Sequence, residues 1–222
     1  MSEYPGFYQP YQEYVSIDEV KSKTYFITAI SMIIAGAIVL FFLENGLPAI
    51  IFFLGVIGWL VALIIGFFAR SEKTHKILLY IIVPSSAITI TPLIQIIIST
   101  SGAFIVGMAF FLTSAIVFSA YFYVKIKNPD LTPMGKYLNI GLWAVIIFGI
   151  IGIFLSFSPF IYFIYSLFVA VLFSLYIFYD ISLIEKRQIY SPYSAALNLY
   201  LDIFILFKQL LYILWILFGD KS

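Results

Sequence analysis

The sequence predicts an all-α integral membrane protein, a bundle of seven transmembrane helices with the last helix at its centre. The first of three observations behind this prediction is composition: of 222 residues, 63% are hydrophobic and only 10% are charged. Soluble domains carry about 25% charged residues, so water cannot be the solvent of this surface. The other two observations are a series of long apolar runs and the regular placement of lysine and arginine between them.

Seven apolar runs follow one another along the chain, and a helix needs about 20 such residues to cross a membrane. They cover residues 24–43, 49–69, 77–98, 103–124, 137–155, 160–184 and 195–218. Such runs are too long for the strands of a membrane barrel, so they are expected to be helices. The chain then divides into a cytoplasmic tail at 1–23, a membrane domain at 24–218 and a short tail at 219–222.

Basic residues alternate with these runs. Ten of the twelve lysines and arginines lie in the first tail and in every second connection, and the three intervening connections carry none. The ten are Lys21, Lys23, Arg70, Lys73, Lys76, Lys125, Lys127, Lys136, Lys186 and Arg187. Because lysine and arginine are retained on the cytoplasmic side, we expect a cytoplasmic N-terminus. The expected location is a prokaryotic plasma membrane.

Several kinds of chemistry are excluded by composition. The chain has no cysteine and one histidine, which excludes thiolate catalysis, disulfides and metal clusters built from those residues. It has no serine in a nucleophile elbow, no HExxH motif and no phosphate-binding glycine loop. The net charge of +1 implies no nucleic-acid partner. We therefore expect neither an enzyme nor a resident cofactor.

Three charged residues fall inside the apolar runs: Asp180, Asp202 and Lys208. A charge near the bilayer centre costs about 2.5–3.5 kcal/mol, so such residues usually face the bundle interior or pair with one another. At 1.5 Å per residue, Asp180 lies about 7 Å and Asp202 about 12 Å from the cytoplasmic end of its run. The two runs are consecutive and antiparallel, so the carboxyl groups are expected to meet. Arg70, which ends the second run, is the expected counter-charge.

Two carboxyl groups in a site of low dielectric constant cannot both ionise cheaply, so they are expected to share a proton and to titrate as one unit. Such a pair is suited to sensing protons or to binding a divalent cation such as Ca²⁺ through its oxygens. In the alternative interpretation, each aspartate only holds the bundle together through a helix end or Arg70. A membrane aspartyl protease would need a glycine beside one aspartate, and neither aspartate has one.

The same residues carry a resemblance to a known family. The segment Phe-Ser-Leu-Tyr-Ile-Phe-Tyr-Asp at 173–180 and the segment Asn-Leu-Tyr-Leu-Asp at 198–202, followed by Phe207, resemble the signature of the Bax inhibitor (transmembrane Bax inhibitor motif) family. Arg70 and Pro92 agree with it more weakly. The resemblance implies a seven-helix calcium-leak channel in which Asp180 and Asp202 form a pH-sensing latch with Arg70 as ionic partner. The sequence departs from the family at Ile205, where asparagine is common, and at Lys208.

Candidate pore-lining residues lie mainly in the third run, where prolines each free a backbone carbonyl beside several hydroxyl groups. The candidates are Pro84, Thr89, Thr91, Pro92 and, in the last run, Asn198. The alternative is an ordinary proline kink whose carbonyls are satisfied by neighbouring serine and threonine.

Two further groups of residues are expected at membrane interfaces and helix contacts. Tyrosines near run ends should anchor at the interface, and a set of small residues should mark a close helix contact. The tyrosines are Tyr80, Tyr121, Tyr123 and Tyr200, and the small residues are Ser114, Ala115, Ser119 and Ala120.

Together these observations predict a pH-sensitive calcium leak channel. Its partners are the lipid bilayer, transported Ca²⁺ and protons, and Asp180 and Asp202 are the candidate Ca²⁺ ligands. The alternative is a membrane-embedded regulator or scaffold that binds a partner such as a membrane protease and transports no ion. The sequence leaves protein partners and oligomeric state open.

Overall fold

The computed structural model describes residues 17–155, 158–186 and 191–219. These form seven long helices and one short 3-10 helix. They are α1 (Ile17–Asn45), α2 (Ala49–Phe68), α3 (Glu72–Ser101), α4 (Phe104–Lys127), η1 (Thr132–Met134), α5 (Gly135–Leu155), α6 (Pro159–Glu185) and α7 (Pro192–Phe218). All seven long helices are long and apolar enough to cross a membrane, which confirms the predicted fold class. Residues 1–16 and 220–222 of the two predicted tails lie outside the described residues.

Two helices begin five or more residues before the apolar run that predicted them. α1 begins at Ile17 rather than at residue 24, with Asp18 and Glu19 in its first turn, where carboxylates favour the helix dipole. α3 begins at Glu72 because the Ser71 side chain caps it, accepting a hydrogen bond of 3.1 Å from the Thr74 amide. Hydropathy identifies only the part of a helix that lies in hydrocarbon, so both polar first turns were missed.

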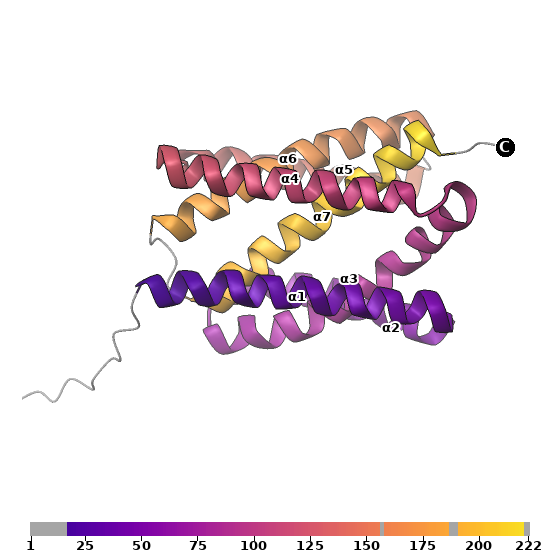
Figure 1. Cartoon of the computed structure of the whole chain (residues 1–222), viewed down its shortest axis with the longest axis horizontal. Helices are drawn as coiled ribbons and strands as arrows, with labels where there is room; N and C mark the ends of the chain where they lie inside the picture. Colours follow the sequence, from indigo (N-terminus) through magenta and orange to yellow (C-terminus); the bar gives the residue numbers. More distant parts are fainter. Residues whose placement is uncertain (1–16, 156–157, 187–190, 220–222) are drawn as a thin grey trace, which may run out of the picture.

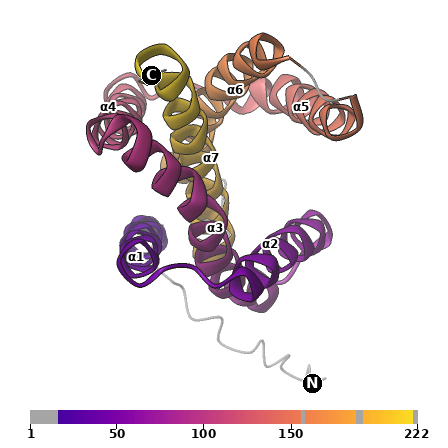
Figure 2. The same ribbon diagram turned by 90° about the vertical axis from the view of Figure 1, so that its right-hand side faces the viewer.

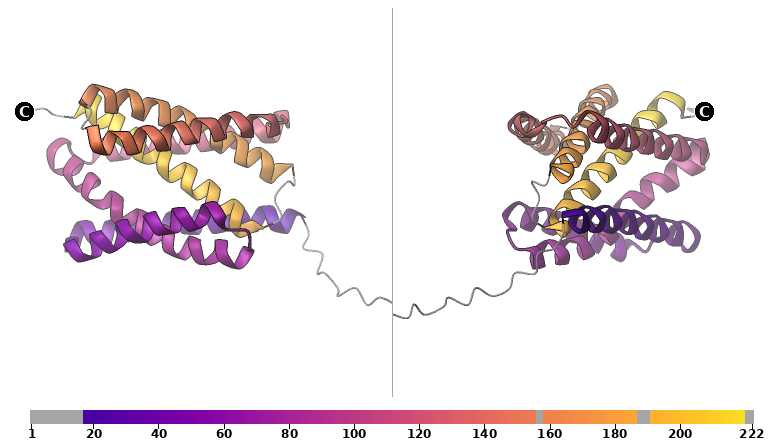
Figure 3. Two further views of the ribbon diagram at one scale, coloured as in Figure 1. Left: turned by 180° about the vertical axis from the view of Figure 1, so that it is seen from behind. Right: turned by 60° about the vertical axis from the view of Figure 1, so that its left-hand side comes forward.

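The last helix is central, as predicted. α7 packs against α6, α4, α1 and α3, whereas α2 packs on α3 and α5 packs on α6. Figure 2 shows α7 between a group formed by α1–α3 and a group formed by α4–α6. α7 crosses the bundle diagonally, with its first turns near α1 and its last turns near α4 and α6 (Figures 1 and 3).

The central position of α7 follows from its side chains, which enter both hydrophobic cores. One core joins α7 to α1–α3 and includes Leu197, Tyr200 and Leu211, and the other joins it to α4–α6 and includes Leu199 and Leu206. α7 therefore packs against helices on both of its sides.

The basic connections gather at one end of the bundle. The start of α1, the α2–α3 connection, the end of α4 and the end of α6 all lie at the left in Figure 1. We call this the basic end.

The expected contact of small residues in α4 is only partly present. Ala120 is buried, whereas Ala115 and Ser119 are exposed. A closer approach occurs between α2 and α3, where a Cβ atom built on Gly55 would lie 2.6 Å from Ile88 Cγ2. Such a distance is too short for any real Cβ, so Gly55 allows the two helices to approach.

Candidate functional site

Asp180 and Asp202 meet inside the bundle. Asp180 lies near the end of α6, Asp202 lies in the third turn of α7, and their side chains are 7% and 6% exposed. The two carboxyl groups lie within hydrogen-bonding reach of each other. The expected contact between them is therefore present, while their role as a sensor stays a prediction.

The close approach of the two carboxyl groups has a chemical consequence. An ionised carboxylate has only acceptor atoms, so two carboxyl groups can bond to each other only when at least one carries a proton. The Oδ2 atom of Asp202 is buried and has no hydrogen-bond partner within the described residues. The pair thus combines a proton-dependent contact with an unsatisfied buried oxygen, a combination that a change of protonation or a bound cation would alter.

A second buried contact fixes α7 beside the pair. The Tyr200 hydroxyl lies 2.6 Å from the Ser86 hydroxyl of α3, and the Tyr200 ring stacks on Phe204 with centroids 6.2 Å apart. Tyr200 is fully buried, so the expectation that it anchors at the membrane interface was wrong. Tyr200 lies near the end of an apolar run, as an interfacial tyrosine would. Only the central placement of α7 shows that this tyrosine is buried.

Arg70 does not join the aspartates in this conformation. It follows α2, its side chain is exposed, and it forms no ion pair with any described residue. Its expected role as counter-charge stays a prediction that would require it to move inward.

The candidate pore-lining residues differ in burial and in hydrogen bonding. Thr89 and Thr91 donate hydrogen bonds of 2.8 Å to the carbonyls of Ser86 and Ala87, within their own helix. Thr91 is buried, Thr89, Pro84 and Pro92 are half-buried, and Asn198 is exposed. These bonds do not reach the carbonyls of Tyr80 and Ile88, which lose their usual donors to Pro84 and Pro92. Pore lining and the alternative of an ordinary kink both stay untested.

Lys208 lies on a different face of α7 from Asp202. Its side chain is exposed at the surface of the bundle, whereas Asp202 is buried. The six residues between them correspond to about 240° of helix rotation, which explains the difference.

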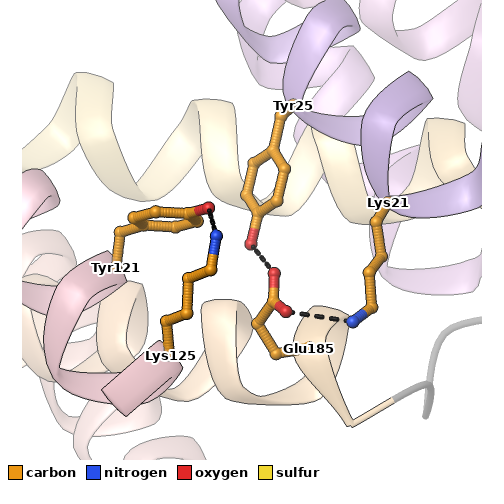
Figure 4. Close-up of polar contacts among 5 residues, drawn as sticks. All are labelled: Lys21, Tyr25, Tyr121, Lys125 and Glu185. Carbon is orange, nitrogen blue, oxygen red and sulfur yellow. Dashed lines mark hydrogen bonds and ion pairs between the residues drawn. The ribbon is translucent and has the colours of Figure 1, made fainter. Parts of the chain in front are cut away.

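A polar cluster at the basic end was missed from the sequence (Figure 4). The Glu185 carboxylate, at the end of α6, accepts hydrogen bonds of 2.9 Å from Lys21 Nζ and from the Tyr25 hydroxyl of α1. The Tyr25 ring packs edge-on against Tyr121 of α4, whose hydroxyl accepts a hydrogen bond from Lys125. The cluster joins α1, α4 and α6 one turn beyond Asp180. Lys21 had been placed in a loose tail, so the sequence offered no signal for this contact.

Comparisons with known proteins agree with this architecture. A family model described as "Inhibitor of apoptosis-promoting Bax1" matches residues 17–220. The chain is 36% identical over 169 residues to an uncharacterized protein of Helicobacter pylori strain J99, covering 73% of this chain and 72% of that protein. It is 32% identical over 179 residues to an uncharacterized protein of Campylobacter jejuni, covering 80% and 76%. It is also 36% identical over 111 residues to the Golgi anti-apoptotic protein of vaccinia virus strain Lister, covering 50% and 46%.

Proposed function

This chain belongs to the Bax inhibitor family, and on that premise we propose that it conducts Ca²⁺ passively across the membrane under the control of Asp180 and Asp202. The observation that carries the proposal is the close approach of two buried carboxyl groups on the central helix and its neighbour. Loss of the shared proton leaves two negative charges in a medium that screens them poorly. Relief requires the helices to separate, Arg70 to move inward or a cation to bind.

The carboxyl oxygens also suit the proposed cargo. Ca²⁺ takes six to eight oxygen ligands, and carboxylates are the commonest charged ones. Among the described residues, no third aspartate, glutamate or histidine joins the pair in a metal-binding group. Conduction requires a site that binds the ion strongly enough to admit it and weakly enough to release it.

The Glu185 cluster adds a contact that opening would disturb. Separation of α6 from α7 at the basic end would strain the bonds from Glu185 to Lys21 and Tyr25. In this proposal the cluster holds the end of α6 against α1 while the aspartates share a proton.

A second function is favoured by one relative. The viral protein is named an anti-apoptotic protein, which suits a membrane-embedded regulator that acts by binding a partner and transports no ion. In that case Asp180 and Asp202 only hold α6 to α7.

Ion flux distinguishes the two functions. Purified full-length protein is reconstituted in liposomes that contain a calcium-sensitive dye, and external Ca²⁺ is added at several values between roughly pH 5 and pH 8. The channel proposal predicts dye signal above protein-free liposomes and a signal that varies with pH. If the protein is folded and inserted but adds no flux at any pH, the result supports the second function, a membrane-embedded regulator.

We also propose that the basic end lies in the cytoplasm of a bacterial cell. Cysteine at the exposed positions Lys73 and Lys127 should then resist a membrane-impermeant thiol reagent in intact cells, while cysteine at Glu44, at the other end of α1, should react. The chain has no native cysteine, so background is absent. Labelling at Lys73→Cys and Lys127→Cys with protection at Glu44→Cys would reverse the orientation.

A further inference from the structure

A groove between α1 and α3 opens on the outside of the bundle near the basic end. Its volume is about 290 Å³. Six of its lining residues are Phe26, Ile30 and Ile34 of α1, Tyr80 and Pro84 of α3, and Tyr193 of α7. Phe26 and Tyr80 are 65% and 66% exposed, so the groove faces the lipid rather than the bundle interior. Pro84, a candidate for pore lining, is also one of the residues that line this groove.

Two lysines converge at the end of this groove. Lys23 Nζ of α1 lies 5.5 Å, and Lys76 Nζ of α3 lies 5.4 Å, from the centroid of the Tyr193 ring. Cation–π contacts of this length hold flexible ammonium groups near one another without neutralising them. Tyr193 itself lines the groove, so the two charges stand directly beside its apolar walls.

No described carboxylate forms an ion pair with these two lysines. Lys21, two residues before Lys23, is paired with Glu185 at 2.9 Å. By contrast, neither Lys23 nor Lys76 forms an ion pair with a carboxylate in the part of the chain that the structure describes. Both side chains are exposed. Two unpaired cations at the membrane surface attract an anion.

The walls of the groove define the rest of the ligand. From Phe26 to Ile34 the α1 side is eight residues long, or about 12 Å at 1.5 Å per residue. That length accommodates most of an acyl chain that runs inward from the headgroup region. A ligand with an anionic end and a long apolar body, presented from the bilayer itself, is an anionic phospholipid.

We propose that this groove binds one anionic phospholipid, with its phosphate between the ammonium groups of Lys23 and Lys76 and an acyl chain between α1 and α3. The site is separate from Asp180 and Asp202, and its occupation does not depend on whether the protein conducts ions. Basic pockets between transmembrane helices on the cytoplasmic side are a known form of lipid recognition.

The test measures retention of a defined lipid by the purified full-length protein. Dioleoyl phosphatidylglycerol and dioleoyl phosphatidylcholine are titrated separately into the protein in detergent, and bound lipid is counted by native mass spectrometry. Phosphatidylglycerol should bind once with higher affinity than phosphatidylcholine. Lys23→Gln with Lys76→Gln should weaken that binding about ten- to thirtyfold, because each lysine contributes about 1 kcal/mol to attraction of an anionic lipid.

Two further variants test whether the loss of lipid binding is specific to this groove and its two lysines. Lys125→Gln with Lys127→Gln removes the same charge from the same end of the bundle, away from the groove, and should leave binding unchanged. Ile30→Trp fills the groove and leaves both lysines, and should also weaken binding. Equal affinity for the two lipids, an equal loss in the Lys125/Lys127 pair, or unchanged binding in Ile30→Trp would each overturn the proposal. Competition by glycerophosphoglycerol, which lacks acyl chains, would show that a free phosphate suffices and would also overturn it.

Discussion

Replacement of Asp180 or Asp202 by asparagine should remove most of the pH dependence of calcium flux. The two buried carboxyl groups lie within hydrogen-bonding reach of each other, so in this proposal one proton belongs to the pair rather than to one residue. Asparagine keeps the size of the side chain and can still donate a hydrogen bond, but it cannot gain or lose that proton. Flux from liposomes should vary about tenfold or more across roughly pH 5 to pH 8 for the natural protein and less than about twofold for each variant.

The double variant distinguishes one shared site from two separate ones. If the aspartates act as one unit, Asp180→Asn and Asp202→Asn together should add little to either alone. Two effects that simply add would show that each carboxyl group acts separately. Single variants that keep the natural pH profile would show that the aspartates have only a structural role.

Asp130 offers a matched control outside the membrane-spanning helices. Hydrogen bonds from Thr132 hold the pKa of the Asp130 carboxyl below its ordinary value. A lowered pKa means that Asp130 is already ionised below the pH range of the assay and stays ionised throughout it. Asp130→Asn should therefore remove one negative charge at the surface and leave the pH profile unchanged.

Replacement of Gly55 by alanine should destabilise the bundle. The added Cβ would lie 2.6 Å from Ile88 Cγ2 and 3.0 Å from Ile88 Cβ. The second atom is close to the α3 backbone, so the clash cannot be relieved by a rotation of the side chain alone, and α2 must move away from α3. Overpacking of this kind costs about 1–3 kcal/mol. The measurement is the midpoint of thermal unfolding in detergent, which should fall by several degrees.

Two other glycines serve as controls. No atom lies within 4 Å of a Cβ built on Gly36 of α1, and on Gly66 of α2 the nearest atom is Leu78 Cδ1 at 3.9 Å. Alanine favours a helix by up to about 1 kcal/mol over glycine, so Gly36→Ala and Gly66→Ala should leave the midpoint unchanged or raise it. A rise in Gly55→Ala as well would show that α2 and α3 do not depend on this close approach.

The sequence by itself determined the number of helices, their alternation and the presence of the aspartates in the membrane. Each of these features depends on local information. A run of about 20 apolar residues must form a helix in lipid because no other continuous backbone can satisfy its own hydrogen bonds. Charges inside such runs stand out because they are costly, and two consecutive antiparallel helices had to bring Asp180 and Asp202 to similar depth.

Only the tertiary structure decided which side chains face inward, because in lipid the apolar pattern does not distinguish the bundle interior from the surface. Tyr200 and Tyr80 both lie near the ends of apolar runs, yet Tyr200 is fully buried and Tyr80 is 66% exposed. Lys21 and Lys23 are two residues apart, and the rotation of α1 directs one to Glu185 and the other to Tyr193. These outcomes depend on the rotation of each helix and on the diagonal packing around α7. Contacts between residues far apart in the sequence determine both.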